Sequence, residues 1–111
     1  MPNKNYQRGR RFEWEVKKDL EKQGYAVMRT AGSHGAYDLI AIYDGTSLYV
    51  RFIQCKVVKK LTDGVKKTLL KELKTSSPVT KAYCSDYSDI TVELFVKETG
   101  TKDYRTFYME P

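Results

Sequence analysis

Two polar residues, Gln54 and Lys56, interrupt a largely apolar run at residues 48–58. If this run is a strand, its side chains alternate between faces, so Gln54 and Lys56 share one face while Cys55 points to the other. An amide and an ammonium are costly to bury without polar partners. They could simply lie on the solvated side of an exposed strand, but the length and apolar character of the run favour a site that gathers further polar groups.

An acidic residue, Asp38, is placed to join this pair. It stands at the start of the preceding predicted strand, residues 38–43. The turn that begins at Asp44-Gly45 lets this strand pair antiparallel with residues 48–58. In that pairing Asp38 lies near Ile53, within a residue or two of Gln54.

A second acidic residue, Glu13, can reach the same place from a helix. Phe12, Val16 and Leu20 recur at four-residue spacing and predict a buried helical stripe. At 100° per residue Glu13 lies about 60° from the centre of that stripe, at the edge of the buried face. Glu15 lies farther round the helix and is expected to be a solvated surface acid.

Together these residues resemble the PD-(D/E)xK nuclease superfamily, and more closely the archaeal-type Holliday junction resolvases within it. The resemblance covers roughly residues 7–60 and is weak beyond them. The stretches that carry it are Arg8-Gly9, Phe12-Glu13, Glu15, residues 20–27, Arg29, Ala31-Gly32-Ser33, residues 38–41 and Lys56-Val57. It implies a restriction-endonuclease-like domain.

The resemblance also implies a metal site made of Glu13, Asp38 and Gln54, with Lys56 as the catalytic lysine. The backbone carbonyl of Cys55 could be a further ligand, and Glu13 could bind the metal directly or through a water. The expected ion is Mg²⁺, with Mn²⁺ as a substitute. Coordination would lower the pKa of a bound water and stabilise charge during phosphodiester hydrolysis. Lys56 would position that water and offset the developing negative charge.

The sequence departs from the family at two positions. Gln54 stands where the family usually has glutamate, and Trp14 stands where it usually has a basic residue. An amide oxygen still binds Mg²⁺, because hard cations accept neutral oxygens. The site nevertheless has one negative charge fewer, so we expect it to hold the metal more weakly.

Several residues around this site are candidate DNA contacts. The resemblance makes Arg29 a phosphate contact and places Ser33 near the scissile strand. Trp14 lies opposite the buried stripe, and an exposed tryptophan suggests an interface with DNA or with a second subunit. The basic residues could equally form an ordinary solvated cluster. The full set is Arg8, Arg10, Arg11, Trp14, Arg29, Ser33, His34, Lys59 and Lys60.

Periodicity and turn residues predict the elements that position these groups. Helices are expected over residues 8–23, ending at Gly24, and over residues 62–74. Strands are expected over residues 25–30, 38–43, 48–58, 79–84, 90–98 and 104–109. This order predicts a single small α/β domain, residues 1–111, with a mixed central β-sheet flanked by helices and a flexible arm at residues 1–7.

Composition fits one domain of 111 residues, with 41% hydrophobic and 31% charged residues. No apolar run is long enough for a membrane span, and no secretory signal is recognisable. The two cysteines are too few for a disulfide scaffold. A cytoplasmic protein of a prokaryote, or of a virus that infects one, is expected.

The positive charge is concentrated in the first part of the chain. Residues 1–60 hold 12 Lys and Arg against 6 Asp and Glu, whereas residues 61–111 hold 8 against 8. Nucleic acid is the commonest partner of such a polarised charge, although a solvated basic surface without a ligand gives the same pattern.

The favoured interpretation is a homodimeric, metal-dependent endonuclease that resolves four-way DNA junctions by paired cuts. A four-way junction offers two equivalent strands, so two active sites are expected. A partner protein from recombination or replication could recruit it. The alternatives are a nuclease of the same fold that acts on other branched or duplex DNA, and a DNA-binding module that has lost catalysis through Gln54. An RNA-binding protein is supported by charge alone.

Overall fold

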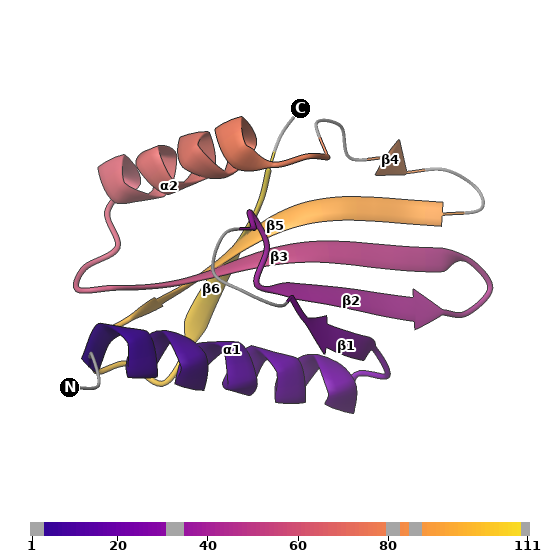
Figure 1. Ribbon diagram of the computed structural model, residues 1–111, viewed down its shortest axis with the longest axis horizontal. Coiled ribbons are helices and arrows are strands. Elements are labelled where there is room, and N and C mark those ends of the chain that lie inside the picture. The colour runs from indigo at the N-terminus through magenta and orange to yellow at the C-terminus, as the bar shows by residue number, and fades with distance from the viewer. Residues whose placement is uncertain (1–3, 31–34, 80–82, 85–87, 110–111) are drawn as a thin grey trace.

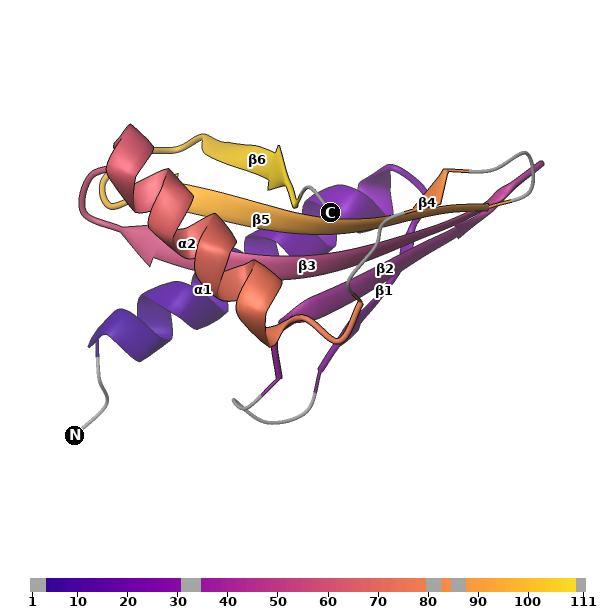
Figure 2. The same ribbon diagram turned by 90° about the horizontal axis from the view of Figure 1, so that it is seen from above.

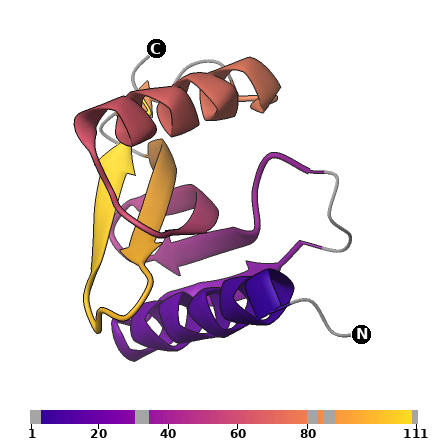
Figure 3. The same ribbon diagram turned by 90° about the vertical axis from the view of Figure 1, so that its left-hand side faces the viewer.

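A mixed β-sheet lies between two helices, one against each face (Figures 1 and 3). The computed structural model describes residues 4–30, 35–79, 83–84 and 88–109. The helices are α1 (Lys4–Lys22) and α2 (Asp63–Ser76). The strands are β1 (Ala26–Arg29), β2 (Leu39–Asp44), β3 (Leu48–Val58), β4 (Tyr83–Cys84), β5 (Ser88–Glu98) and β6 (Tyr104–Tyr108). The predicted α/β class is confirmed.

Helix α1 buries the predicted stripe and ends where the sequence indicates. Phe12, Val16 and Leu20 are almost fully buried. Gly24 has φ of +98°, the left-handed conformation that ends many helices and that glycine adopts without strain. The helix begins at Lys4 rather than Arg8, so residues 4–7 do not form the predicted flexible arm. These residues contain neither proline nor glycine, so nothing in their sequence stops the helix.

The sheet has the order β1-β2-β3-β5-β4, and β6 also pairs with β5. Strands β3 and β5 run parallel, side by side along the length of the molecule, and the remaining pairs are antiparallel (Figure 2). The antiparallel pairing of β2 with β3 is confirmed, but its register is shifted by one residue. Tyr43 pairs with Tyr49, not Leu48, because the turn is tight enough for Asp44 to pair with Leu48.

Strand β3 matches the predicted range, whereas the predicted strand at residues 79–84 is observed only as β4; residues 80–82 lie outside the described residues. Helix α2 begins after Thr62, whose hydroxyl accepts a hydrogen bond from the backbone N–H of Val65 at 3.2 Å. Such an N-cap satisfies one of the free donors of the first turn.

Each helix covers its own hydrophobic cluster. The cluster under α1 is formed by Phe12, Val16, Leu20, Val27, Leu39, Ala41, Ile53, Cys55 and Phe95. The cluster under α2 is formed by Tyr37, Leu73, Val92, Leu94, Val96 and Met109. Because Ile53 and Cys55 face α1, strand alternation directs Gln54 and Lys56 toward the α2 side. No described helix is long and apolar enough to cross a membrane.

Candidate metal centre

The site lies where β3 continues past the beginning of β2. Leu39, the first residue of β2, pairs with Ile53, whereas β3 extends to Val58. Asp38 comes directly before β2, and its backbone N–H donates to the carbonyl of Ile53 at 2.8 Å. One oxygen of its carboxylate, Oδ2, accepts a hydrogen bond from the backbone N–H of Cys55 at 2.8 Å. A side chain thus takes the place of the missing strand and fixes a carboxylate at the open edge of β3.

Glu13 approaches this edge from α1. Its side chain is only 18% exposed, and its Oε1 lies 3.9 Å from Nη2 of Arg29. Burial raises the pKa of Glu13, and the negative charge of Asp38 raises it further. The charges of Arg29 and Arg10 act in the opposite direction. The two carboxylates are therefore close enough to repel one another.

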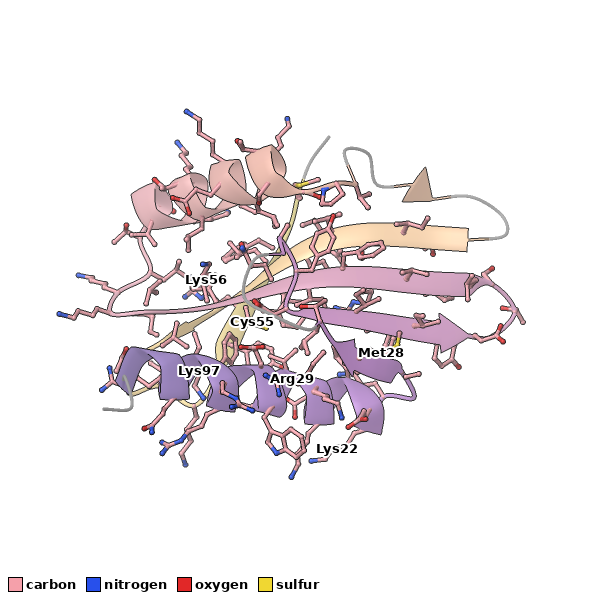
Figure 4. The ribbon with its side chains drawn as sticks, viewed as in Figure 1. Lys22, Met28, Arg29, Cys55, Lys56 and Lys97 are labelled. Carbon is pink, nitrogen blue, oxygen red and sulfur yellow. The ribbon has the colours of Figure 1, made fainter. Side chains whose placement is uncertain are left out.

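Asp38 is also influenced by groups from both faces of the sheet. Burial raises its pKa, while the hydrogen bond from Cys55 and the charges of Lys56 and Arg29 lower it. Figure 4 shows Lys56 on the α2 side of β3, and Cys55 and Arg29 on the α1 side. Because β2 does not extend along this part of β3, groups from the two faces can meet around the open edge.

Gln54 contributes an amide oxygen with an unusual environment. Its Oε1 is buried and has no hydrogen-bond partner among the described residues. A buried acceptor without a partner is costly. The raised pKa values of Glu13 and Asp38 show a second cost, because their surroundings disfavour the charged carboxylates. A hard divalent cation, which prefers carboxylate and amide oxygens, would relieve both costs. The chemistry of these donors therefore fits a hard divalent cation.

The donor set departs from an all-acidic one. No group of three His, Cys, Asp or Glu side chains in the described part of the chain could hold a metal ion. The thiol of Cys55 lies in the core under α1, and burial, with the charges of Asp38 and Glu13, raises its pKa, so it stays a thiol. A metal site at this edge would need the amide of Gln54 and a backbone carbonyl as further ligands.

A model of the archaeal Holliday junction resolvase (Hjc) family matches residues 4–82. The crossover junction endodeoxyribonuclease Hjc of Methanocaldococcus jannaschii is 39% identical over 74 residues, which are 67% of this chain and 53% of that protein. The chain belongs to the archaeal Holliday junction resolvase family. The resemblance inferred from the sequence is confirmed, although the match spans only about half of that relative.

A solved member of the resolvase family has the same fold. The structure of Archaeoglobus fulgidus Hjc, a Holliday junction resolvase from an archaeal hyperthermophile, superposes with a TM-score of 0.52 and 20% sequence identity. The match covers 92% of this chain and 73% of that one. At this identity the likeness establishes the fold, and the roles of individual residues depend on the geometry of this chain.

The predicted DNA contacts of this resolvase-family chain divide between two sides of α1. Arg10 and Arg29 lie close enough to Glu13 to influence its pKa. Arg8 and Arg11 instead line a hollow on the other side of the helix, together with Glu15. Ser33 and His34 fall outside the described residues.

Glu15 is not the free surface acid that was predicted. Its Oε1 lies 2.7 Å from Nζ of Lys97 on β5. The helical projection correctly placed Glu15 away from Glu13. It could not show that a lysine distant in sequence lies against that side of α1.

Trp14 and the lysines after β3 are exposed, as predicted. Trp14 is 52% exposed, and the ammonium groups of Lys17 and Lys18 each lie 5.3 Å from its ring centroid. Cation–π contacts of this kind hold positive charge around the ring. Lys59 and Lys60 lie directly beyond the end of β3. Positive charge therefore surrounds the exposed ring of Trp14, and two further exposed lysines follow the end of β3.

The raised pKa of Glu13 predicts a stability effect. A folded-state pKa above the unfolded value stabilises the protein below the unfolded pKa, and this contribution is lost as the pH rises through the folded pKa. Without metal, Glu13→Gln should therefore melt about 2–5 °C higher than wild type at pH 7, and the difference should vanish below the ordinary carboxyl range. Calorimetry in a chelator measures both, with Glu21→Gln on the exposed side of α1 as the matched control. An equal or lower melting temperature at pH 7 would contradict the raised pKa of Glu13.

Proposed function

We propose that this chain is a divalent-metal-dependent endonuclease that resolves four-way DNA junctions as a homodimer. The observation that carries the proposal is the Asp38 carboxylate held by the Cys55 N–H at the open edge of β3, within electrostatic reach of Glu13 and Lys56. Membership of the archaeal resolvase family supports it.

The metal ligands in this proposal are Glu13, Asp38, the Oε1 of Gln54 and the backbone carbonyl of Cys55. The N–H and C=O of one strand residue point to the same edge, so the Cys55 carbonyl points toward Asp38. Mg²⁺, or Mn²⁺ in its place, supplies an acidic bound water and a positive charge against the phosphate. The hydrogen bond from Cys55 fixes the Asp38 carboxylate through Oδ2 and leaves its other oxygen available to the metal.

The ammonium of Lys56 acts on the site from the α2 side of the open edge of β3. Its charge acts on Asp38 and thereby favours the carboxylate form that a metal requires. In the reaction, the same ammonium holds the attacking water by a hydrogen bond and offsets negative charge that develops on the phosphate. Neither role can be performed by an uncharged side chain of similar size.

The DNA contacts in this proposal follow the surface around the carboxylates. Arg10 and Arg29 bind phosphates of the scissile strand, and Lys59 and Lys60 bind the backbone beyond β3. Trp14 lies against the DNA, while Ser33 and His34, in the segment before β2, complete the contacts to the cut strand. Arg8 and Arg11, on the other side of α1, bind a second arm. Phosphate contacts of this kind read shape rather than sequence.

Two copies are required because a junction is resolved by two cuts on equivalent strands. We assign the protein to the cytoplasm of a prokaryotic cell, encoded by the cell itself or by a virus that infects it, because the proposed substrate occurs there. Recruitment by a recombination or replication protein fits the same substrate.

Cleavage of a four-way junction and of a linear duplex with the same sequence, each with Mg²⁺ and with Mn²⁺, tests the function. We expect paired cuts in the junction and little cutting of the duplex. Equal cutting of both would show a nuclease with another substrate. Tight junction binding without nicking in either metal would show a DNA-binding module, the alternative that Gln54 favours.

Gln54→Glu is expected to tighten Mg²⁺ binding by about tenfold, because it adds a negative charge directly to the site. Titration calorimetry measures the affinity without DNA, and the Mg²⁺ dependence of cleavage measures it in the reaction. Gln23→Glu, an exposed position after α1, adds the same charge away from the site and serves as the control. Unchanged Mg²⁺ affinity in Gln54→Glu would show that Gln54 is not a ligand.

A further inference from the structure

A groove with a volume of about 610 Å³ lies between α2 and β6, away from the candidate metal centre. Its floor is apolar, with Leu70, Phe107 and Met109. Its basic side is formed by Lys66, Lys71 and Lys74 of α2. The ammonium of Lys66 lies 4.6 Å from the ring centroid of Phe107. None of the described residues that line the groove is acidic.

Strand β6 offers an unpaired edge beside this groove. It pairs with β5 on one side, and no described strand pairs with its other side. Figure 3 shows β6 at the outer margin of the sheet, with α2 above it. Its exposed Tyr108 is 64% accessible. Backbone N–H and C=O groups at such an edge are a ready template for another strand.

Helix α2 leaves part of its apolar face accessible. Leu73 is its one fully buried residue among those described, whereas Leu69 and Leu70 are only partly buried. Three lysines of the helix, Lys66, Lys71 and Lys74, lie along the groove with the apolar floor.

We propose that this groove binds an acidic segment of a partner protein, which adds to β6 as an extended strand. In an extended segment alternate side chains face opposite ways, so acidic residues can meet the lysines while apolar residues enter the groove. The backbone of the segment satisfies the open edge of β6. Charge complementarity selects this occupant, since the lining carries three positive charges and no negative one.

Two other occupants fit less well. DNA phosphates could neutralise the lysines, but they would leave the Leu70 and Met109 floor and the strand edge without partners. A second copy of this chain that used the same groove would bring its own three lysines toward these three. The groove also lies at the β5 side of the sheet, so an occupied groove leaves the metal centre between β2 and β3 open. The proposal is independent of the proposed nuclease function.

A short synthetic peptide in which glutamate alternates with valine is the probe. Fluorescence anisotropy measures its binding, and amide hydrogen exchange measured by NMR reports on Tyr104–Tyr108. We expect binding and slower exchange in β6. The K66E/K71E/K74E variant should lose at least about tenfold in affinity. K22E/K67E/K102E changes the net charge equally at exposed lysines that do not line the groove and should lose no more than about twofold.

Several results would overturn the proposal. Equal binding of a peptide with lysine in place of glutamate would exclude acidic recognition, and unchanged exchange in β6 would exclude strand addition. Displacement of the peptide by junction DNA, with a larger loss of junction affinity in K66E/K71E/K74E than in the control, would make the groove a nucleic-acid surface. A change of oligomeric state confined to that variant, measured by light scattering, would make it a subunit interface. Failure of junction cleavage leaves the peptide result standing.

Discussion

Asp38→Asn is expected to reduce junction cleavage at least about a thousandfold while leaving junction binding largely intact. The asparagine oxygen can still accept the hydrogen bond from the Cys55 N–H, so the local backbone is preserved. The negative charge that attracts the metal is lost. Since burial raises the pKa of Asp38, its carboxylate is held in an environment that disfavours negative charge until a cation is bound.

Single-turnover cleavage of a four-way junction with Mg²⁺ measures this loss, and a gel-shift titration in a chelator measures binding. Asp44→Asn is the matched control, because Asp44 is exposed at the other end of β2 and the charge change is the same. The metal-free melting temperature should not fall, since the substitution also removes repulsion from Glu13. Cleavage at the wild-type rate would show that the site has been placed incorrectly.

Local patterns were sufficient to predict much of the geometry of the candidate site. The alternation in residues 48–58 predicted that Gln54 and Lys56 share a face opposite to Cys55, and the stripe Phe12, Val16, Leu20 predicted the position of Glu13. These periodicities are set by the backbone of a single element. The position of Asp38 depended on a turn, and its register was wrong by one residue, because turn length is a weaker signal than periodicity.

Contacts between distant segments could not be predicted in the same way. Glu15 pairs with Lys97, and Arg51 forms a two-point ion pair with the buried Glu93, at 2.7 and 2.8 Å. Arg51 lies on β3 and Glu93 on β5, which pair in parallel. The order of the elements along the sequence does not determine that these two strands are neighbours. No pattern within either strand indicates its partner.

The open end of β3 is the feature that links the fold to the proposed chemistry. Had β2 extended alongside Val58, backbone hydrogen bonds would have closed the edge that Asp38 now occupies. Because β2 begins opposite Ile53, a carboxylate accepts the Cys55 N–H and residues from both faces approach it. The mismatch in strand length is therefore a requirement of the site.

Lys56→Ala is the second substitution with a large expected effect, a loss of about 100-fold to 1000-fold in the single-turnover rate. Its charge lowers the pKa of Asp38, so its removal should also raise that pKa and weaken Mg²⁺ binding at low pH. Asp38 loses its proton as the pH increases, so Mg²⁺ affinity should then recover. The lost stabilisation of the reacting phosphate should not recover. Titration calorimetry of Mg²⁺ binding and the single-turnover rate, each measured at several pH values, separate the two roles.

Lys67→Ala provides the matched control, since Lys67 is an exposed lysine of α2 far from the open edge of β3. Lys56→Arg keeps the charge but changes its geometry, so Mg²⁺ affinity should be retained while cleavage recovers only in part. If Lys56→Ala instead lowered junction affinity and left the rate at saturating DNA unchanged, Lys56 would be a phosphate contact. A rate defect that persists at high pH, with Mg²⁺ affinity restored, is the result that assigns Lys56 to the chemical step.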